Sequence, residues 1–375
     1  MKIIVGRFLF LNTIKQVYEI IPKNPCLPTL SCILIETKNN GILLSGTDLD
    51  VSSRIFLDCK IKERGAFVIH AKQLLDIVCG IKESNINIES NNDEIIINET
   101  KINGILSSDD FPQLKDSIIG EFVSFPVFHL EDIIEKIRGF VSVDFQRSAL
   151  MGIYCKITSD EIIMVATDGH RLSFCKKQIG LEIKNSIEMI IPNKTIEYVL
   201  YLLSKNVILK GMYYNKNETL FDFSNVKIWS KLIDGIYPNY EQVIPKNNSK
   251  IVYINNQVFK ETIKSAIPFL NNITKQIKLI FLQNRLEIIL KNSDTGIESK
   301  KCIDIKYEND SITTAFNANF LLEILNRIET DTVRLELETP ATACIIKPVL
   351  QFEGLLFNTM DLEYYYLLMP LRLTD

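Results

Sequence analysis

The sequence lacks the patterns that mark membrane, secreted and zinc-binding proteins. It has no apolar run of about 18 residues or more, so we expect no membrane-spanning helix. The apolar stretch at residues 1–5 is too short for a signal peptide, and we expect a cytosolic chain. There are three histidines, and none of the eight cysteines forms a Cys-x-x-Cys pair, which argues against a zinc site. Most cysteines lie in apolar runs, which predicts buried, reduced thiols.

The motifs of common enzymes are missing too. The sequence has no Gly-x-Ser-x-Gly motif, no phosphate-binding loop and no metal-ligand spacing. Asp168 and His170 are a candidate acid–base pair, but alternate residues of a strand point to opposite faces. No third group lies close in sequence to orient the imidazole, so we expect no catalytic residue, metal or cofactor. A hydrolase-like enzyme centred on His170 is one alternative, which loss of turnover in His170→Ala would support.

An excess of basic charge is also absent. The chain has 42 Lys and Arg against 46 Asp and Glu, which gives a formal net charge of −4. A protein that grips DNA tightly through its phosphates needs many basic contacts, so composition alone argues against that mode of binding. Apolar residues, by contrast, make up 46% of the 375 residues, which is enough to fill the cores of two or three domains.

Helical periodicity occurs six times along the chain, in three pairs. The first helix of each pair is predicted from Leu11, Ile14, Tyr18 and Ile21, from Ile133, Ile134, Ile137 and Phe140, and from Phe259, Ile263 and Ile267. The second is predicted from Leu74, Leu75, Val78 and Ile81, from Ile196, Val199, Leu200 and Leu203, and from Leu321, Leu322, Leu325 and Ile328. The second helices open at Ala71, Asn193 and Asn317, which lie 122 and 124 residues apart. Such regular spacing indicates a threefold internal repeat.

Strands separate these helices. Strand-like runs, bounded by turn residues, cover residues 31–37, 41–45, 95–98, 152–157, 161–166, 278–282 and 285–290. Turn-rich joins recur around Pro112 and Pro238, 126 residues apart. We therefore predict an α+β protein of three similar domains at residues 1–120, 121–248 and 249–375.

Several motifs within this repeat match one known family in order and spacing. They are Ala166-Thr167-Asp168-Gly169-His170-Arg171-Leu172, its echo Gly46-Thr47-Asp48-Leu49-Asp50, and the C-terminal Met369-Pro370-Leu371-Arg372-Leu373. Shorter matches are Leu27-Pro28-Thr29-Leu30, Asp110-Phe111-Pro112, Pro238-Asn239-Tyr240 and Phe316-Asn317. With these motifs the chain resembles the bacterial β sliding clamps, the processivity subunits of the replicative DNA polymerase.

The resemblance implies three clamp-type domains, each with two helices against antiparallel sheet. Two protomers would join head to tail, first domain to third, into a ring whose hole is lined by helices. The ring would encircle double-stranded DNA without sequence preference and would have no chemistry of its own. Its partners would be the catalytic subunit of the replicative polymerase, the ATP-driven clamp loader and other proteins with a clamp-binding motif.

A geometric estimate supports a dimer independently. Helices pack about 8–10 Å apart, so six helices around a hole would leave a bore under about 10 Å, too narrow for duplex DNA. Twelve helices would leave roughly 20–28 Å. Only a homodimer of this chain would therefore admit a duplex.

The resemblance also implies a pocket for short partner peptides. Its residues would be Arg147, Leu150, Thr167, Gly169, His170, Arg171, Leu172, Pro238, Val243, Asn317, Phe320, Met369, Pro370, Leu371 and Arg372. The aliphatic members would form an apolar cavity, and Arg147, His170, Asn317 and Arg372 would hold polar atoms at its rim.

Two further surfaces are expected. Basic residues on the six helices would face the DNA: Arg7, Lys15, Lys72, Lys82, Lys136, Arg138, Lys194, Lys205, Lys260, Lys264 and Arg327. A closed ring with a basic bore and an acidic exterior would not need to bind DNA tightly, because the ring itself keeps the DNA from leaving. A net charge of −4 is then compatible with a DNA-encircling protein. The dimer interface would include Ile105, Leu106, Phe269 and Leu270.

The sequence departs from the family pattern at three places. Asn24 stands where an early loop often has a basic residue, which puts a DNA role of that loop in doubt. Gln242 replaces a common basic rim residue, and Thr374 and Asp375 extend the usual C-terminus. Both of these changes predict weaker binding of acidic peptides. A three-domain adaptor that uses the pocket but never encircles DNA is the second alternative.

Overall fold

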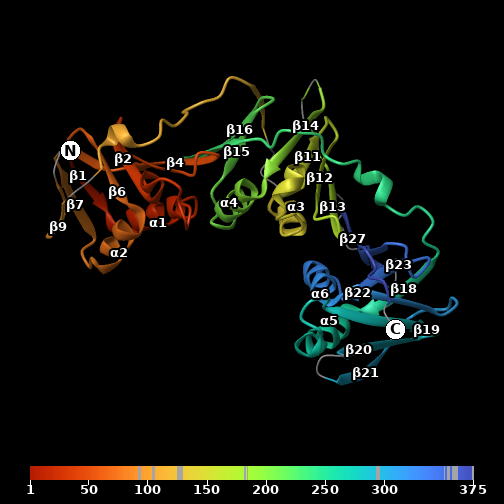
Figure 1. Ribbon diagram of the computed structural model, residues 1–375. Helices are drawn as coiled ribbons and strands as arrows, with labels where there is room; N and C mark the ends of the chain where they lie inside the picture. The colour runs from red at the N-terminus through yellow and green to blue at the C-terminus, as the bar shows by residue number, and fades with distance from the viewer. Residues whose placement is uncertain are drawn as a thin grey trace. The chain divides into compact units, whose positions relative to one another are not determined.

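The structure is a computed structural model, and it describes most of the chain (Figure 1). The described residues are 1–91, 94–103, 106–124, 130–180, 183, 185–292, 296–349, 351–352, 355–356 and 362–373. They form two compact units. Unit 1 comprises Met1–Glu131 and Ile191–Asp234, and unit 2 comprises Asp132–Ile190 and Gly235–Asp375. No helix in the described part of the chain is long and apolar enough to cross a lipid bilayer.

Unit 1 combines helices with two antiparallel sheets. Its helices are α1 (Arg7–Tyr18), α2 (Ala71–Gly80) and α4 (Asn193–Ser204), with the short η1 (Pro28–Ser31) and η2 (Ser108–Asp110). One sheet has the order β5 (Lys60–Glu63), β1 (Lys2–Gly6), β7 (Asn85–Ser90), β8 (Glu94–Ile97), β9 (Thr100–Asn103). The other has the order β10 (Glu121–Val123), β15 (Leu209–Tyr214), β16 (Glu218–Phe223), β17 (Val226–Lys231), β4 (Val51–Asp58), β3 (Gly41–Thr47), β2 (Cys32–Lys38), β6 (Ala66–His70).

Unit 2 repeats this combination. Its helices are α3 (Leu130–Ile137, from its third residue on), α5 (Asn256–Ala266) and α6 (Ala318–Arg327), with η3 (Phe145–Met151), η4 (Tyr240–Val243) and η5 (Ile267–Phe269). The larger sheet has the order β14 (Ile187–Pro192), β11 (Gly152–Ile157), β12 (Glu161–Thr167), β13 (Arg171–Gln178), β27 (Leu362–Leu368), β24 (Cys344–Pro348), β23 (Thr332–Leu337), β18 (Lys250–Asn255). The smaller has the order β21 (Ile297–Asp304), β20 (Arg285–Asn292), β19 (Gln276–Leu282), β22 (Ile312–Asn317), and β25 (Gln351–Phe352) pairs with β26 (Leu355–Leu356).

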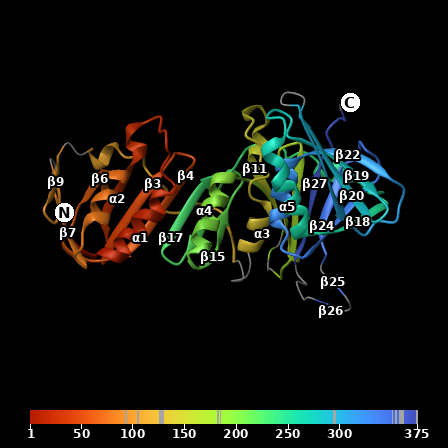
Figure 2. The ribbon, with the colours of Figure 1, turned by 90° about the horizontal axis from the view of Figure 1, so that it is seen from below.

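The helices form where the apolar spacing predicts them, and each buries its apolar face. Phe259 and Ile263 of α5 are fully buried, one helical turn apart. The side chain of Asn255 caps this helix by accepting a hydrogen bond from the backbone N–H of Val258. Pro268 follows within η5, consistent with the end of α5 at Ala266. Figures 1 and 2 show α1 beside α2 within unit 1, and α5 contacts α6 within unit 2.

The second predicted domain contributes strands to both units. Its β17 pairs with β4 in unit 1, and its β13 pairs with β27 in unit 2, each in antiparallel register. Each of the two eight-stranded sheets therefore contains strands from two of the domains predicted from sequence. The α+β class with antiparallel sheets is confirmed, whereas the boundaries near residues 120 and 248 stay a prediction.

All eight cysteines are free thiols, and four of them are buried: Cys32, Cys155, Cys175 and Cys344. Burial raises the pKa of Cys155 and of Cys175 to about 12, so both thiols are protonated near neutral pH. The expected burial holds for these four cysteines, but Cys26, Cys79 and Cys302 are exposed, which the apolar runs did not predict.

Candidate functional site

The Thr-Asp-Gly motif forms the tight turn between β12 and β13. Thr167 donates its hydroxyl to the carbonyl of Arg171 at 2.6 Å, and the backbone N–H of Gly169 donates to the Thr167 hydroxyl at 3.1 Å. Asp168 Oδ1 accepts hydrogen bonds from the backbone N–H groups of His170 and Arg171 at 2.8 and 3.0 Å. Gly169 has a φ of +88°, which favours glycine. Threonine and aspartate thus shape the turn through its backbone.

The echo of this motif in unit 1 repeats the turn almost bond for bond. Thr47 donates to the carbonyl of Val51 at 2.9 Å, and Leu49 N–H donates to the Thr47 hydroxyl at 2.9 Å. Asp48 Oδ1 accepts from the N–H groups of Asp50 and Val51 at 3.1 and 2.7 Å. Leu49 takes the glycine's place with a φ of +80°. The internal repeat predicted from spacing therefore extends to individual hydrogen bonds.

The C-terminal motif lies against the turn between β12 and β13. The backbone N–H of Met369 donates to the carbonyl of His170 at 2.9 Å, and that of Leu371 donates to the carbonyl of Ala315 in β22 at 2.7 Å. Met369 keeps 41% of its surface exposed. Gln276 of β19 donates to the carbonyl of Arg372 at 3.3 Å. Two motifs separated by some two hundred residues in the sequence are therefore neighbours in the fold.

Aromatic and cationic side chains surround the turn between β12 and β13. The imidazole of His170 stacks on Phe320 of α6, with ring centroids 6.4 Å apart and planes at 24°. Arg147 is exposed, and its Nε donates to Asp144 Oδ2 at 3.0 Å. A Cβ added to Gly169 would lie 2.8 Å from Arg147 Nη1, so the guanidinium rests over the turn. A hydrogen bond from the backbone N–H of Gln146, then the Arg147 side chain, lowers the pKa of the Asp144 carboxyl.

Arg171, by contrast, lies beneath the turn and is only 6% exposed. Its Nε donates to Asp168 Oδ2 at 3.0 Å, Nη1 to Glu323 Oε2 at 2.7 Å, and Nη2 to the carbonyl of Gly139 at 2.9 Å. The guanidinium lies 4.6 Å from the ring centroid of Phe140 and 4.4 Å from that of Phe320. Arg171 thus braces the turn from the side of the core and offers little surface to a ligand.

The remaining predicted pocket residues differ in accessibility. Leu150 and Leu172 are buried, at 7% and 1% exposure, whereas Val243 is 53% exposed. The side chain of Asn317 caps α6 by accepting from the N–H groups of Asn319 and Phe320, so it is already engaged. Pro238 lies two residues before η4, and Val243 is its last residue. Two tyrosines, one before η4 and one at its start, contact β12 and β13. Tyr237 donates to the carbonyl of Val165 at 3.3 Å, and the ring of Tyr240 lies 6.2 Å from that of Phe174.

The arrangement does not suit acid–base catalysis. Both oxygens of Asp168 accept hydrogen bonds from the turn and from Arg171, which commits this carboxylate to structure. Among the described residues, no cluster of three or more His, Cys, Asp or Glu side chains could hold a metal ion.

The predicted DNA-facing residues also differ in exposure. Exposed ones are Lys15, Lys72, Lys82, Lys205 and Lys264, and partly buried ones are Arg7, Arg138, Lys194, Lys260 and Arg327. Lys136 is only 5% exposed. Its ammonium group donates to the carbonyl of Arg327 at 3.1 Å and to Glu329 Oε1 at 2.5 Å. The prediction that Lys136 faces DNA is therefore wrong, because a carbonyl and a carboxylate distant in sequence enclose its charge.

The predicted interface residues are spread over both units. Ile105 lies outside the described residues. Leu106 is partly buried, bridges to Val68 and packs on the core of unit 1. Phe269 is 48% exposed, whereas Leu270 is 3% exposed and packs inside unit 2. Phe269 is therefore the better source of apolar contact area for a partner.

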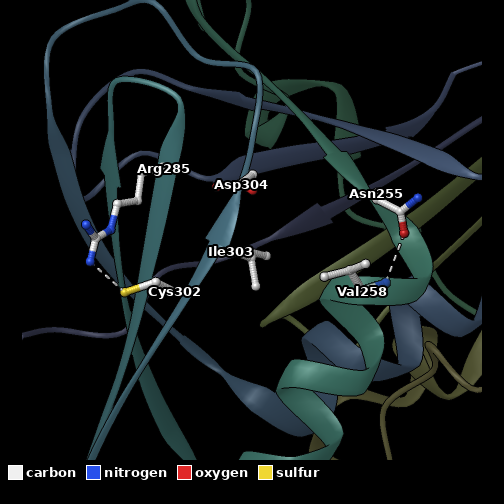
Figure 3. A pocket seen from close by; sticks show the side chains of 6 residues that line it. All are labelled: Asn255, Val258, Arg285, Cys302, Ile303 and Asp304. Carbon is white, nitrogen blue, oxygen red and sulfur yellow. Dashed lines mark hydrogen bonds between the residues drawn. The ribbon is translucent and has the colours of Figure 1, made fainter.

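A cavity of about 650 Å³ opens beside the start of α5, and none of the predicted pocket residues lines it (Figure 3). It is lined by Asn255, Val258, Arg285, Cys302, Ile303 and Asp304. Arg285 Nη2 donates to Cys302 Sγ at 2.9 Å, and Asn255 caps α5, so these polar groups already have partners within the chain. The cavity indicates no chemistry of its own.

Comparisons with known proteins cover the whole chain. Three sequence profiles match in tandem: the DNA polymerase III beta subunit N-terminal domain at residues 1–115, its central domain at 125–239 and its C-terminal domain at 241–354. The beta sliding clamps of Haemophilus influenzae and Chlamydia pneumoniae are each 27% identical over 379 aligned residues, with all of both chains covered.

Solved structures agree with the sequence comparison. A sliding clamp (DNA polymerase III subunit beta) from Bartonella birtlesii, bound to griselimycin, superposes with a TM-score of 0.90 at 25% identity. The DNA polymerase III subunit beta from Pseudomonas aeruginosa has the same fold, with a TM-score of 0.90 at 23% identity. Each comparison covers 100% of both chains.

Proposed function

This chain belongs to the DNA polymerase III beta subunit family, and on that premise we propose that two copies close head to tail around duplex DNA. It is a DNA sliding clamp, a non-enzymatic processivity factor that holds the polymerase and other clamp-binding proteins on DNA. The observation that carries this assignment is the tandem match of all three family domains along the chain. Because chromosome replication in bacteria takes place in the cytoplasm, we place its action there.

The sheet edges support a head-to-tail junction. β9 of unit 1 and β21 of unit 2 are end strands of their sheets. Pairing β9 of one protomer with β21 of its partner would continue both sheets and cover two edges that otherwise invite aggregation. Phe269 would add apolar area beside this pairing.

The exposed lysines suit loose contact with DNA. We assign this role to Lys15, Lys72, Lys82, Lys205 and Lys264, because their side chains are exposed on or just beyond the helices. A few phosphate contacts of this kind attract the duplex without fixing its position, and they weaken as salt rises.

The pocket for partner peptides would lie where the Thr167–Arg171 turn meets the C-terminal segment. Leu172 and Leu150 would pack beneath its floor, and Met369 and Leu371 would form its wall. Methionine is flexible and polarisable, which suits a wall that must accept several partners. Arg147 would meet polar atoms of the peptide at the rim. The hydrogen bond from Met369 to His170 supports this placement, because it holds wall and turn together.

The ring is tested by mass and by topology. Sedimentation equilibrium should give about twice the chain mass of 43.0 kDa. The protein, loaded on nicked circular DNA by its clamp loader, should be retained during gel filtration and released when the circle is cut. Binding of the polymerase subunit without retention on the circle would instead support the adaptor that never encircles DNA.

The pocket is tested with griselimycin, the ligand in the Bartonella birtlesii structure. Calorimetric titration should show one site per protomer, and griselimycin should compete with the polymerase catalytic subunit. Binding without competition would place the ligand elsewhere and would contradict the pocket.

Truncation after Leu373 is expected to strengthen binding of acidic peptides up to about fivefold. The change removes the carboxylate of Asp375, and a single exposed charge contributes at most about 1 kcal/mol. Thr374 and Asp375 lie outside the described residues, so the prediction rests on sequence. Fluorescence anisotropy with a labelled acidic peptide and its Asn/Gln counterpart measures the effect. Equal affinities of the acidic peptide for the two chains would contradict it.

A further inference from the structure

The turn of the pocket is fastened to α6 by one ion pair. Arg171 Nη1 donates to Glu323 Oε2 at 2.7 Å across 152 positions of sequence. The second carboxylate bonded to Arg171, Asp168, lies on the same turn. The pair with Asp168 therefore stiffens the turn internally, and the pair with Glu323 joins the turn to α6, beside the contacts that His170 and Arg171 make with Phe320.

The surroundings of Glu323 are built to admit its carboxylate. Gly139 has a φ of +83°, and a Cβ added there would lie 2.8 Å from Glu323 Oε1. The carbonyl of Gly139 also accepts the Arg171 Nη2 hydrogen bond at 2.9 Å. A residue with a side chain at position 139 would thus both strain the backbone and displace the carboxylate.

Because the Arg171 side chain is buried, loss of its ion pair with Glu323 should affect the position of the turn. The Arg171 side chain is 7% exposed and that of Glu323 37%, so neutralising Glu323 would leave the largely buried guanidinium with Asp168 as its remaining carboxylate partner. A hydrogen bond from Arg171 to a neutral group at position 323 is weaker than one to a carboxylate, so the turn would be held less firmly to α6. His170 on the turn and Phe320 on α6 stack across this junction, and both are predicted pocket residues. A small shift would therefore change the distance between two walls of the pocket.

We propose that Glu323 is a positioning residue for partner binding, which holds the Thr167–Arg171 turn at the distance from α6 that the peptide requires. The proposal rests on the pocket assigned above. Glu323 itself touches no peptide, and it acts through Arg171 on His170 and Phe320. The affinity for partner peptides should then depend on the Glu323 carboxylate, although Glu323 is not among the residues predicted to line the pocket.

Glu329 provides a matched control. It lies two residues beyond the end of α6, it also binds a buried cation, and its Oε1 accepts from Lys136 at 2.5 Å. Glu329→Gln and Glu323→Gln therefore remove the same charge from neighbouring positions. The link of Lys136 is to α3 and not to the turn, so only Glu323→Gln should alter the pocket.

The test combines affinity with a local spectroscopic signal. Glu323→Gln should weaken griselimycin binding about tenfold by calorimetry, and Glu329→Gln should leave it within twofold. The chain has only three histidines, so histidine-selective ¹³C labelling with NMR can follow the His170 ring, identified by His170→Ala. Loss of stacking on Phe320 should move the His170 ring signals in Glu323→Gln and leave them in place in Glu329→Gln.

The outcomes separate this inference from the pocket itself. If the wild-type chain does not bind griselimycin, the pocket assignment fails. If the wild-type chain binds and Glu323→Gln matches it in both affinity and His170 signals, the positioning role is overturned. Should Glu323→Gln fold poorly, Glu323→Asp keeps the charge but shortens its reach, and should give a smaller loss of affinity in the same direction; unchanged affinity and His170 signals there would also overturn it.

Discussion

Replacing Phe269 by aspartate is expected to convert the dimer into monomers and to abolish retention on circular DNA. The Phe269 side chain is 48% exposed at the end of η5, so it can be covered by a partner. The substitution removes the apolar surface that Phe269 buries against the partner and places a carboxylate there that must lose water. Together these effects cost about 2 kcal/mol per junction. A ring has two identical junctions, so the loss doubles to about 4 kcal/mol, close to a thousandfold in dimer affinity.

The measurement is sedimentation equilibrium, paired with gel filtration of protein loaded on nicked circles. Ile208→Asp is the matched control, because Ile208 is a similarly exposed apolar residue, at 56%, in the loop between α4 and β15. The control should remain dimeric and stay on the circle. A Phe269→Asp protein that is still dimeric at nanomolar concentration would place the junction elsewhere.

Deleting residues 369–375 is expected to weaken partner binding by a hundredfold or more while leaving the ring intact. The deletion begins after the last residue of β27 and removes Met369, Pro370 and Leu371, which we propose as the apolar wall of the pocket. Three partly buried apolar side chains at roughly 1 kcal/mol each give about 3 kcal/mol, which is somewhat more than a hundredfold. The hydrogen bonds from Met369 to His170 and from Leu371 to Ala315 are lost as well.

Calorimetry with griselimycin and anisotropy with a labelled peptide of the polymerase catalytic subunit measure this loss. The chain truncated after Leu373 keeps the wall and is the control, and both chains should sediment as dimers. Retained affinity in the chain that lacks residues 369–375 would show that the wall of the pocket is not the C-terminal segment. Loss of dimers alongside loss of binding would show that the segment supports the fold and not only the pocket.

The helices and many of the strands follow from local patterns. α2 and α4 begin at Ala71 and Asn193 as predicted, and α6 begins one residue after Asn317, which is its cap. Apolar spacing and capping act within a few residues, so they can be read in order along the chain. Phe140 shows the limit of this reading. The pattern assigned it to a helix, but α3 ends at Ile137, and the Phe140 ring lies against the Arg171 guanidinium.

Charged residues were harder to place from the sequence. Lys136 and Lys264 look alike on predicted helices, yet the first is buried against Glu329 and the second is exposed. Arg171 was predicted to line the pocket, and its side chain is buried beneath the turn between β12 and β13. In both cases the deciding partners are far away in sequence, and a helical pattern contains no information about them.

Residue order alone revealed three repeated modules, the family and two motifs that the fold makes neighbours. These features depend on the spacing of residues along the chain and on turns whose hydrogen bonds join residues only a few positions apart. The fold decided which cations are free and which are enclosed, and it brought Glu323 to Arg171 across 152 positions. The physical reason is that the cost of burying a charge depends on the groups that surround it in space, and those groups come together only when distant segments pack.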